Sequence, residues 1–135
     1  MTTQELRIGN LLTSKSWKGA HSIGGIVKHT KESFTLTMNG YEHKYEEGKY
    51  FDLEPIPLDE SWLIKAGFEN NSYSVFSRKI SEYAWLSISF KDYACSMICE
   101  NPDIADHDTN APCKYVHQLQ NLYHALTGTE LTLNN

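Results

Sequence analysis

The chain has 135 residues, 40% of them hydrophobic, and its 12 Lys and Arg against 17 Asp and Glu give a formal net charge of −5. This size and composition are typical of a folded soluble protein, so we expect residues 1–135 to form a single domain. Nucleic acid is disfavoured as a partner because clustered Lys and Arg supply most affinity for phosphates, and a membrane partner is not expected because no apolar run approaches about 18 residues.

The first half of the chain has the patterns of short strands and turns. Residues 23–27 predict a strand whose two glycines indicate a bulge or a close approach of another backbone. Two alternating runs flank Asn39 and Gly40, the pair that best accepts the positive φ of a type I′ hairpin turn. We therefore expect hairpin strands at 33–38 and 41–46.

A short helix is expected after one more strand at 50–53. Two prolines keep the connection extended. Asp59 is a good N-cap, and Gly67 is placed where a helix would stop. Residues 59–66 should therefore form a helix of about two turns.

The middle of the chain predicts a three-strand antiparallel meander. Strands are expected at 73–80, 84–91 and 94–100, where apolar and polar residues alternate between short turns. Residues 101–112 are rich in Asp, Asn, Pro and Thr and have no period. They therefore predict a loop.

The last quarter predicts an amphipathic helix that ends at Gly128, followed by a short strand. Five apolar residues lie at the spacing of one helical face. Four polar residues lie opposite, where they either bind a partner or form the ordinary solvent-exposed face of a packed helix. The apolar residues are Val116, Leu119, Leu122, Tyr123 and Leu126, and the polar residues are His117, Gln120, Asn121 and His124.

These elements together predict an α+β fold. Its N-terminal half is rich in strands, with an SH3-like small barrel as one option. A short capped helix, an antiparallel three-strand meander, a C-terminal helix and a short final strand follow.

Three motifs carry a resemblance to a family. They read ELRIGN at 5–10, PIPLDESWLIKAGF at 55–68 and VHQLQNLYHALTGTEL at 116–131. As a set they resemble a group of small uncharacterised proteins of Bacteroidota phages and mobile elements. The resemblance spans the start, middle and end of the chain. It implies a phage-related intracellular setting and supplies no catalytic residues.

A metal site is not favoured by the cysteines. Cys95, Cys99, Cys113 and His107 could supply four zinc ligands. However, Cys95 and Cys99 share one face of an expected strand, which is typical of small buried residues. An odd number of cysteines without a signal-peptide pattern indicates reduced thiols in the cytoplasm. We expect no metal and no cofactor.

No complete catalytic set is recognisable in the sequence. Asp106, His107 and Asp108 could pair a carboxylate with a base, but an acid-rich loop is usually just solvated. His117 and His124 lie two helical turns apart, about 10 Å along the axis, which is too far for a shared metal. Glycine-rich phosphate loops and the nucleophile-elbow motif are also missing.

Two tryptophans are candidate binding residues. Trp17, beside Lys18 in an expected loop, could stack on a nucleotide base, although packing onto the barrel is the interpretation we favour. Trp85 alternates with Leu86 and points away from the core if Leu86 faces it. The pattern leaves open whether Trp85 is an exposed anchor or lies under a second layer.

The sequence favours a non-enzymatic phage-type binding protein that counteracts or modulates a host protein in the cytoplasm. One alternative is sequestration of a small signalling nucleotide of host defence in an aromatic pocket between protomers, which would require a homo-oligomer. A further alternative is a small hydrolase that uses the His and Asp residues. The candidate ligand- or partner-binding residues are Trp17, Lys18, Trp85, His117, Asn121 and His124.

Overall fold

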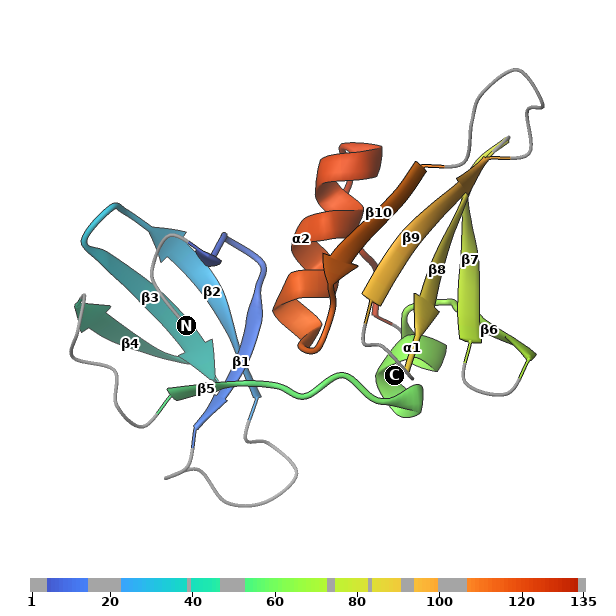
Figure 1. The fold of residues 1–135 in the computed structure, drawn as a ribbon. Helices are drawn as coiled ribbons and strands as arrows, with labels where there is room; N and C mark the ends of the chain where they lie inside the picture. The colour runs from blue at the N-terminus through green and yellow to red at the C-terminus, as the bar shows by residue number, and fades with distance from the viewer. Residues whose placement is uncertain are drawn as a thin grey trace. The chain divides into compact units, whose positions relative to one another are not determined.

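Two antiparallel sheets and two helices make up the described part of the computed structural model (Figure 1). The chain divides into two compact units, each described here by itself. Whether residues 1–135 act as a single domain stays a prediction. The described residues are 5–14, 23–38, 40–46, 53–72, 75–82, 84–90, 94–99 and 107–133. Unit 1 comprises Met1–Pro57 and Tyr115–Asn121, and unit 2 comprises Leu58–Lys114 and Leu122–Asn135.

Unit 1 contains a curled five-strand antiparallel sheet with the order β4-β3-β2-β1-β5 (Figure 1). Its strands β4 and β5 each pair on one side only among the described strands, so the sheet is an open half-barrel. The strands are β1 (Leu11–Ser14), β2 (Ile23–His29), β3 (Ser33–Met38), β4 (Tyr41–Glu46) and β5 (Leu53–Pro55).

The hairpin of β3 and β4 confirms the prediction from Asn39 and Gly40. Both strands have the expected bounds, and their register runs without irregularity from Met38 opposite Tyr41 to Ser33 opposite Glu46. Gly40 has a φ of 82°, a conformation that glycine adopts without a steric penalty. The local turn chemistry therefore sets this register.

Alternation places the core of unit 1 on one face of the sheet. Phe34 and Leu36 from β3 are 1% and 0% exposed, and the ring of Tyr45 stacks on that of Phe34 with centroids 5.6 Å apart. Strand β2 has a register shift between Ile26 and Lys28, beyond the two glycines at which a bulge was expected; both glycines pair in regular register with β1. The buried cluster consists of Leu6, Leu12, Ile26, Phe34, Leu36 and Leu53.

Unit 2 begins with the predicted capped helix α1 (Glu60–Lys65). The side chain of Asp59 accepts a hydrogen bond from the Trp62 N–H at 3.0 Å, which satisfies one of the free donors at the helix start. Gly67 follows with a φ of 84°. The N-cap and the stop signal are therefore both confirmed.

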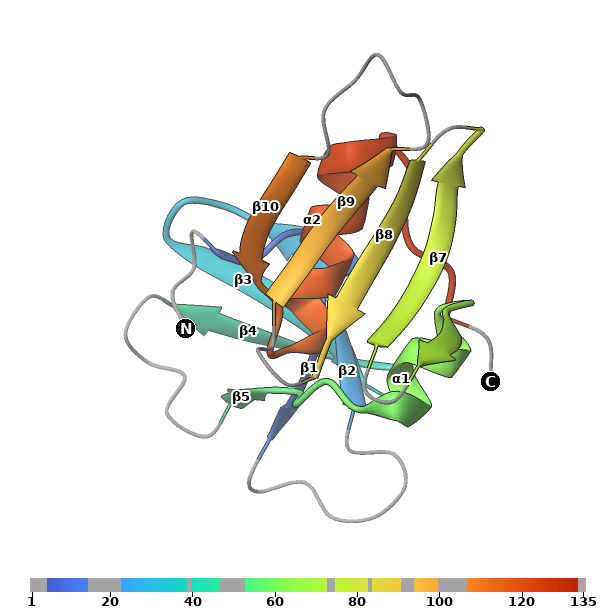
Figure 2. The same ribbon diagram turned by 45° about the vertical axis from the view of Figure 1, so that its right-hand side comes forward.

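The sheet of unit 2 has five antiparallel strands in the order β10-β9-β8-β7-β6, and Figure 2 shows β10, β9, β8 and β7 side by side. Strands β7, β8 and β9 confirm the expected meander. Leu86 and Ile88 of β8 are fully buried on one face, and Ser87 is buried on the other. The strands are β6 (Glu69–Ser72), β7 (Val75–Ser81), β8 (Ala84–Ser89), β9 (Ala94–Cys99) and β10 (His107–Pro112).

Strands β6 and β10 were not expected, and the prediction of a loop through 112 is wrong for β10. Residues 101–106 of that expected loop lie outside the described part. Both strands are sheet edges rich in polar residues, so their pairing depends on the backbone of the neighbouring strand more than on their own side chains. Pro112 is tolerated because an edge strand need not donate on its outer side.

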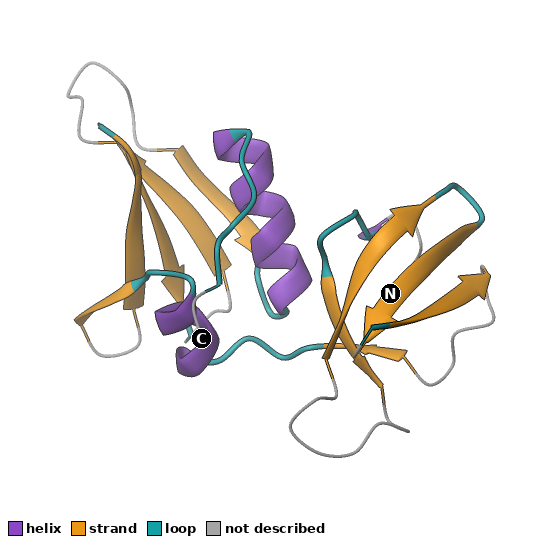
Figure 3. Ribbon diagram, turned by 180° about the vertical axis from the view of Figure 1, so that it is seen from behind, coloured by secondary structure: helices purple, strands orange, loops and turns teal. Residues whose placement is uncertain are grey.

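The C-terminal helix α2 (Val116–Thr127) is confirmed, and the Gly128 N–H donates to the His124 carbonyl at 2.8 Å where it ends. The expected final strand is wrong, because residues 129–133 form no strand and follow α2 as a loop (Figure 3). There the Thr129 N–H donates to the Thr127 hydroxyl at 3.2 Å, a local bond that turns the chain.

Helix α2 contributes to the packing of unit 2 through its second half. Tyr123 is 8% exposed, and its ring centroid lies 5.0 Å from Cζ of Arg78 on β7. Leu126, expected on the apolar stripe, is 37% exposed. Among the described residues, neither helix is long and apolar enough to cross a membrane.

Candidate functional site

The segment before β1 forms a tight turn that is fixed on β2 within unit 1. The Arg7 N–H donates to Oδ1 of Asn10 at 2.7 Å, and the Asn10 N–H donates to the Arg7 carbonyl at 3.0 Å. Next to this turn, the Gly9 N–H donates to the Ile26 carbonyl at 2.8 Å, and the Ile26 N–H donates to the Asn10 carbonyl at 2.9 Å. Backbone groups of residues 7–10 are therefore presented in a fixed arrangement.

Gln120 of α2 binds this turn through both ends of its side-chain amide. Its Nε2 donates to the Gly9 carbonyl at 2.9 Å, and its Oε1 accepts from the Leu11 N–H at 3.0 Å. Gln120 is only 3% exposed. A buried amide that is paired at both ends stabilises this contact, because leaving either backbone group unpaired would be costly.

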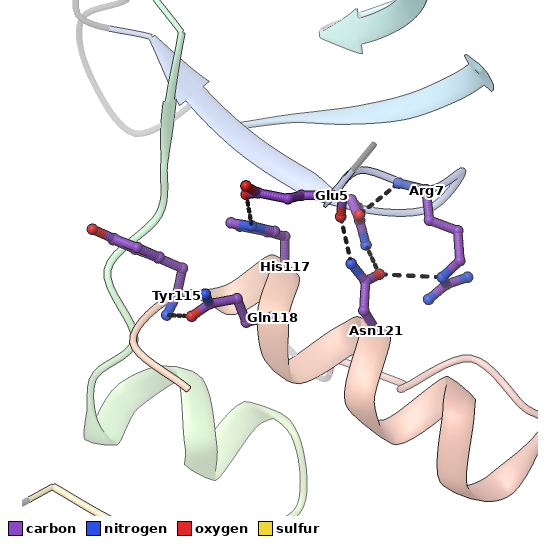
Figure 4. A network of polar contacts seen from close by, with 7 residues as sticks. Glu5, Arg7, Tyr115, His117, Gln118 and Asn121 are labelled. Carbon is purple, nitrogen blue, oxygen red and sulfur yellow. Dashed lines mark hydrogen bonds and ion pairs between the residues drawn. The ribbon is translucent and has the colours of Figure 1, made fainter. Parts of the chain in front are cut away.

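Asn121 extends the same network (Figure 4). Its Oδ1 accepts from Nδ2 of Asn10 at 2.8 Å and from Nε of Arg7 at 3.2 Å, and its Nδ2 donates to the Glu5 carbonyl at 2.8 Å. Nη2 of Arg7 also donates to the Gln120 carbonyl at 3.3 Å. We call these five residues, Glu5, Arg7, Asn10, Gln120 and Asn121, the polar clasp.

His117 lies beside the polar clasp without a hydrogen bond. Its ring is 1% exposed and stacks on Tyr115, with centroids 5.9 Å apart. Nε2 lies 4.0 Å from Oε2 of Glu5, the contact drawn as a dashed line in Figure 4, which is too far for a hydrogen bond. Neither ring nitrogen has a hydrogen-bond partner among the described residues. Burial lowers the pKa of His117 below its ordinary value of 6.5, and the Glu5 carboxylate offsets only part of this effect.

The polar face of α2 is thus not the solvent-exposed face that the sequence suggested. His117 and Gln120 are buried, so that expectation is wrong for both. Asn121 binds the chain's own N-terminal segment, and His124 is half-buried and does not belong to the polar clasp. The role of His117, Asn121 and His124 in partner binding stays a prediction.

The remaining candidate residues are not brought together by the described structure. Trp17 and Lys18 lie outside the described residues. Trp85 is half-buried on β8, with Nζ of Lys79 5.9 Å from its ring centroid. Trp85 is therefore neither a fully exposed anchor nor a fully buried core residue.

The residue types that could hold a metal do not gather in the described part of the chain. No group of three or more His, Cys, Asp or Glu side chains is close enough there to bind an ion. Cys113 is a buried free thiol. The side chains of Cys95, Cys99 and His107 and the whole of Asp106 lie outside the description, so their proposed chemistry stays untested.

Two open hollows of unit 1 lie beside the turn between β2 and β3. The larger has a volume of about 430 Å³ and is lined by residues of both charges, Thr30, Glu32, Ser33, Lys44 and Glu46. A neighbouring hollow of about 250 Å³ includes Lys28, His29 and Phe34. Both hollows are formed by one chain, so they do not test the aromatic nucleotide pocket expected between protomers.

The three sequence motifs meet in unit 1. The polar clasp joins the first motif to the last, and the Val116 N–H donates to the carbonyl of Ile56 in the middle motif at 2.9 Å. Pro57 and Tyr115 form an isolated antiparallel bridge next to this bond. Comparison of the chain with protein-family models, with curated proteins and with solved structures finds no match.

Sequence reasoning missed Glu5, Arg7 and Asn10 as members of this arrangement. Asn10 entered the sequence analysis only as part of the ELRIGN motif, and Gln120 only as part of the polar face of the expected helix. The available signal was that two separate motifs each contained polar residues next to apolar core positions. That signal does not say which two motifs pair.

Replacing Gln120 with Ala is expected to lower the free energy of unfolding by about 3 kcal/mol, because the Gly9 carbonyl and the Leu11 N–H would each lose a buried partner. Urea unfolding followed by circular dichroism measures this change. His124→Ala, on the same helix but outside the polar clasp, should cost less than about 1 kcal/mol. Equal effects of the two substitutions would contradict the assignment.

Stability should fall as the pH drops below the ordinary His117 pKa of 6.5. The folded pKa lies below that value, so the unfolded chain takes up a proton first, and protonation favours unfolding. His117→Phe removes this titration and should flatten the decline in melting temperature between about pH 8 and pH 5. Parallel profiles for the two proteins would show that His117 is not buried in its neutral form.

Proposed function

We propose that this protein is a non-enzymatic phage-type binding protein, which attaches to a host protein in the bacterial cytoplasm and counteracts or modulates it. The observation that carries the proposal is a group of exposed aliphatic side chains on unit 1. The setting comes from the resemblance of the three motifs to phage proteins.

The exposed group lies on strands β1 and β2 and on the turn before β1, and we call it the outer patch. Ile8, Ile23 and Val27 are 53%, 37% and 42% exposed. From Ile23 to Val27 the buried positions of β2 alternate with more exposed ones, so Ile23 and Val27 lie on the face opposite the buried Ile26. Ile8 and Val27 are the chain neighbours of Gly9 and Ile26, whose backbones are joined by a hydrogen bond.

Leu11 and Gly25 complete the outer patch. They are opposite each other in the β1–β2 register, and Cδ2 of Leu11 lies 3.5 Å from where a Cβ on Gly25 would be. The side chain of Leu11 therefore packs over Gly25, which has no side chain of its own, and adds apolar surface between Ile23 and Val27. Leaving such aliphatic surface in water forgoes about 25 cal/mol per Å², so a contiguous patch of this kind usually marks an interaction site.

The polar residues of unit 1 favour binding over catalysis in this proposal. The amides of the polar clasp bind the chain's own backbone, and the His117 ring is buried away from any substrate. A general base must reach the proton that it removes, which a sealed ring does not do. A small hydrolase remains a further alternative. Nucleotide sequestration is the alternative that the experiment below distinguishes from protein binding.

Capture of the host protein should depend on the outer patch. Tagged wild-type protein, Ile8→Glu and Ile64→Glu are incubated with lysate of a Bacteroidota host. Ile64 is a matched control, because it is an isoleucine of unit 2 that is 64% exposed on α1. Wild type and Ile64→Glu should retain the same host protein, and Ile8→Glu should retain at least about tenfold less, since a charge in an apolar interface is strongly disfavoured.

Equal capture by all three proteins, or no specific capture by wild type, would contradict protein binding through this surface. Matching melting temperatures show that the variants are folded. A thermal-shift screen with nucleotides runs in parallel, because a ligand that binds only the native state raises its melting temperature. A clear nucleotide-dependent rise would favour sequestration instead.

A further inference from the structure

Four strands form the edges of the two sheets, and β4 differs from the other three. Strand β5 has three residues and ends in Pro55, and the pairings of β6 and β10 each contain a register irregularity. Strand β4 has six residues, pairs with β3 in six consecutive positions and contains no proline. A long, regular and exposed edge is a template for another strand.

Alternate residues of β4 turn their backbone groups away from β3. Met38 and Tyr41 close a two-residue hairpin loop, and the closing pair of such a loop exchanges hydrogen bonds. Tyr41, His43 and Tyr45 therefore bond to β3. Glu42 and Lys44 direct their N–H and C=O groups to the outer side, where no described strand pairs with them.

We propose that the β4 edge binds the β4 edge of a second copy of this chain, antiparallel and with His43 opposite His43 of the partner copy. In this register Glu42 lies opposite Lys44 of the partner copy, and the two-fold axis repeats the pair. Both residues of each pair have outward backbone groups, so each pair closes two hydrogen bonds as well as bringing opposite charges together.

Charge disfavours the two neighbouring registers. If the two-fold axis is moved to Glu42, the Glu42 carboxylates of the two copies lie opposite each other. Shifting the axis to Lys44 places Lys44 opposite its copy and Glu42 opposite Glu46. Like charges directly opposite each other destabilise an antiparallel pair, so charge favours the register centred on His43 over both of its neighbours.

The other face of β4 supports the same register. Tyr41 is 72% exposed, more than any other large hydrophobic residue of the described chain. Pairing centred on His43 sets Tyr41 opposite Tyr45 of the partner copy, and aromatic cross-strand pairs are stabilising. The unit 1 sheets of the two copies would join into one sheet of ten strands. Both copies would then have their outer patch on the same face of that sheet.

Charge reversal tests the pairing. By sedimentation equilibrium, wild type should have twice the chain mass of 15.4 kDa. Lys44→Glu or Glu42→Lys should weaken the dimer at least about tenfold, because each creates two like-charge pairs. The double variant Glu42→Lys/Lys44→Glu should restore it. Lys31→Glu, the same charge change in the β2–β3 turn, should leave the mass unchanged.

Single cysteines test the register. His43→Cys should form a disulfide-linked dimer under mild oxidation, because a non-hydrogen-bonded antiparallel pair brings the two Cα atoms to about 4.5 Å. Glu42→Cys and Lys44→Cys should stay at the background set by wild type, which has three cysteines of its own.

Stronger cross-linking at 42 or 44 than at 43 would overturn the register, and a monomeric wild type would overturn the proposal. The inference does not rest on the proposed function. Ile8→Glu should remain dimeric whether or not it binds a host protein, because Ile8 is not on β4.

Discussion

The side-chain amide of Gln120 is the interaction on which unit 1 depends. It pairs the carbonyl of Gly9 with one end and the N–H of Leu11 with the other, and it does so where solvent is excluded. These two backbone groups lie on either side of Asn10, where the turn passes into β1. The amide therefore fixes the start of β1 against α2. The same amide helps to position the outer patch, because Ile8 precedes Gly9 in the chain and Leu11 itself donates to Gln120.

Burial of His117 beside the polar clasp has a cost in folding free energy. Its two nitrogens are buried without a described hydrogen-bond partner, next to a network in which the amides are well paired. An unpaired buried group costs about 1–3 kcal/mol, so the ring must be held by packing, including its stack on Tyr115. The cost grows when the ring is protonated, which explains the lowered pKa. The position of His117 therefore indicates a structural role. A partner could contact its ring only if the ring became exposed.

Local chemistry made much of the fold predictable. Gly40 and its neighbour fix one hairpin, and Asp59 with Gly67 bounds α1, because turn and capping residues act within a few positions. Strands β6 and β10 were not predicted because both are polar edge strands, whose pairing depends on the backbone of the neighbouring strand and not on an apolar pattern of their own. The polar clasp was not predicted for a different reason. The partners of Gln120 and Asn121 lie 109 to 116 residues away in the chain, and a polar helical face reads the same whether water or another segment covers it.

Amide hydrogen exchange at Leu11 tests the central claim most directly. Its N–H donates to the Gln120 side chain, so its protection should depend on that side chain. In wild type the Leu11 amide should exchange slowly. In Gln120→Met, which keeps the length of the side chain and removes its amide, the Leu11 amide should exchange at least about tenfold faster, while Leu36 in the β3 ladder stays protected. Unchanged protection of Leu11 in this variant would contradict the account.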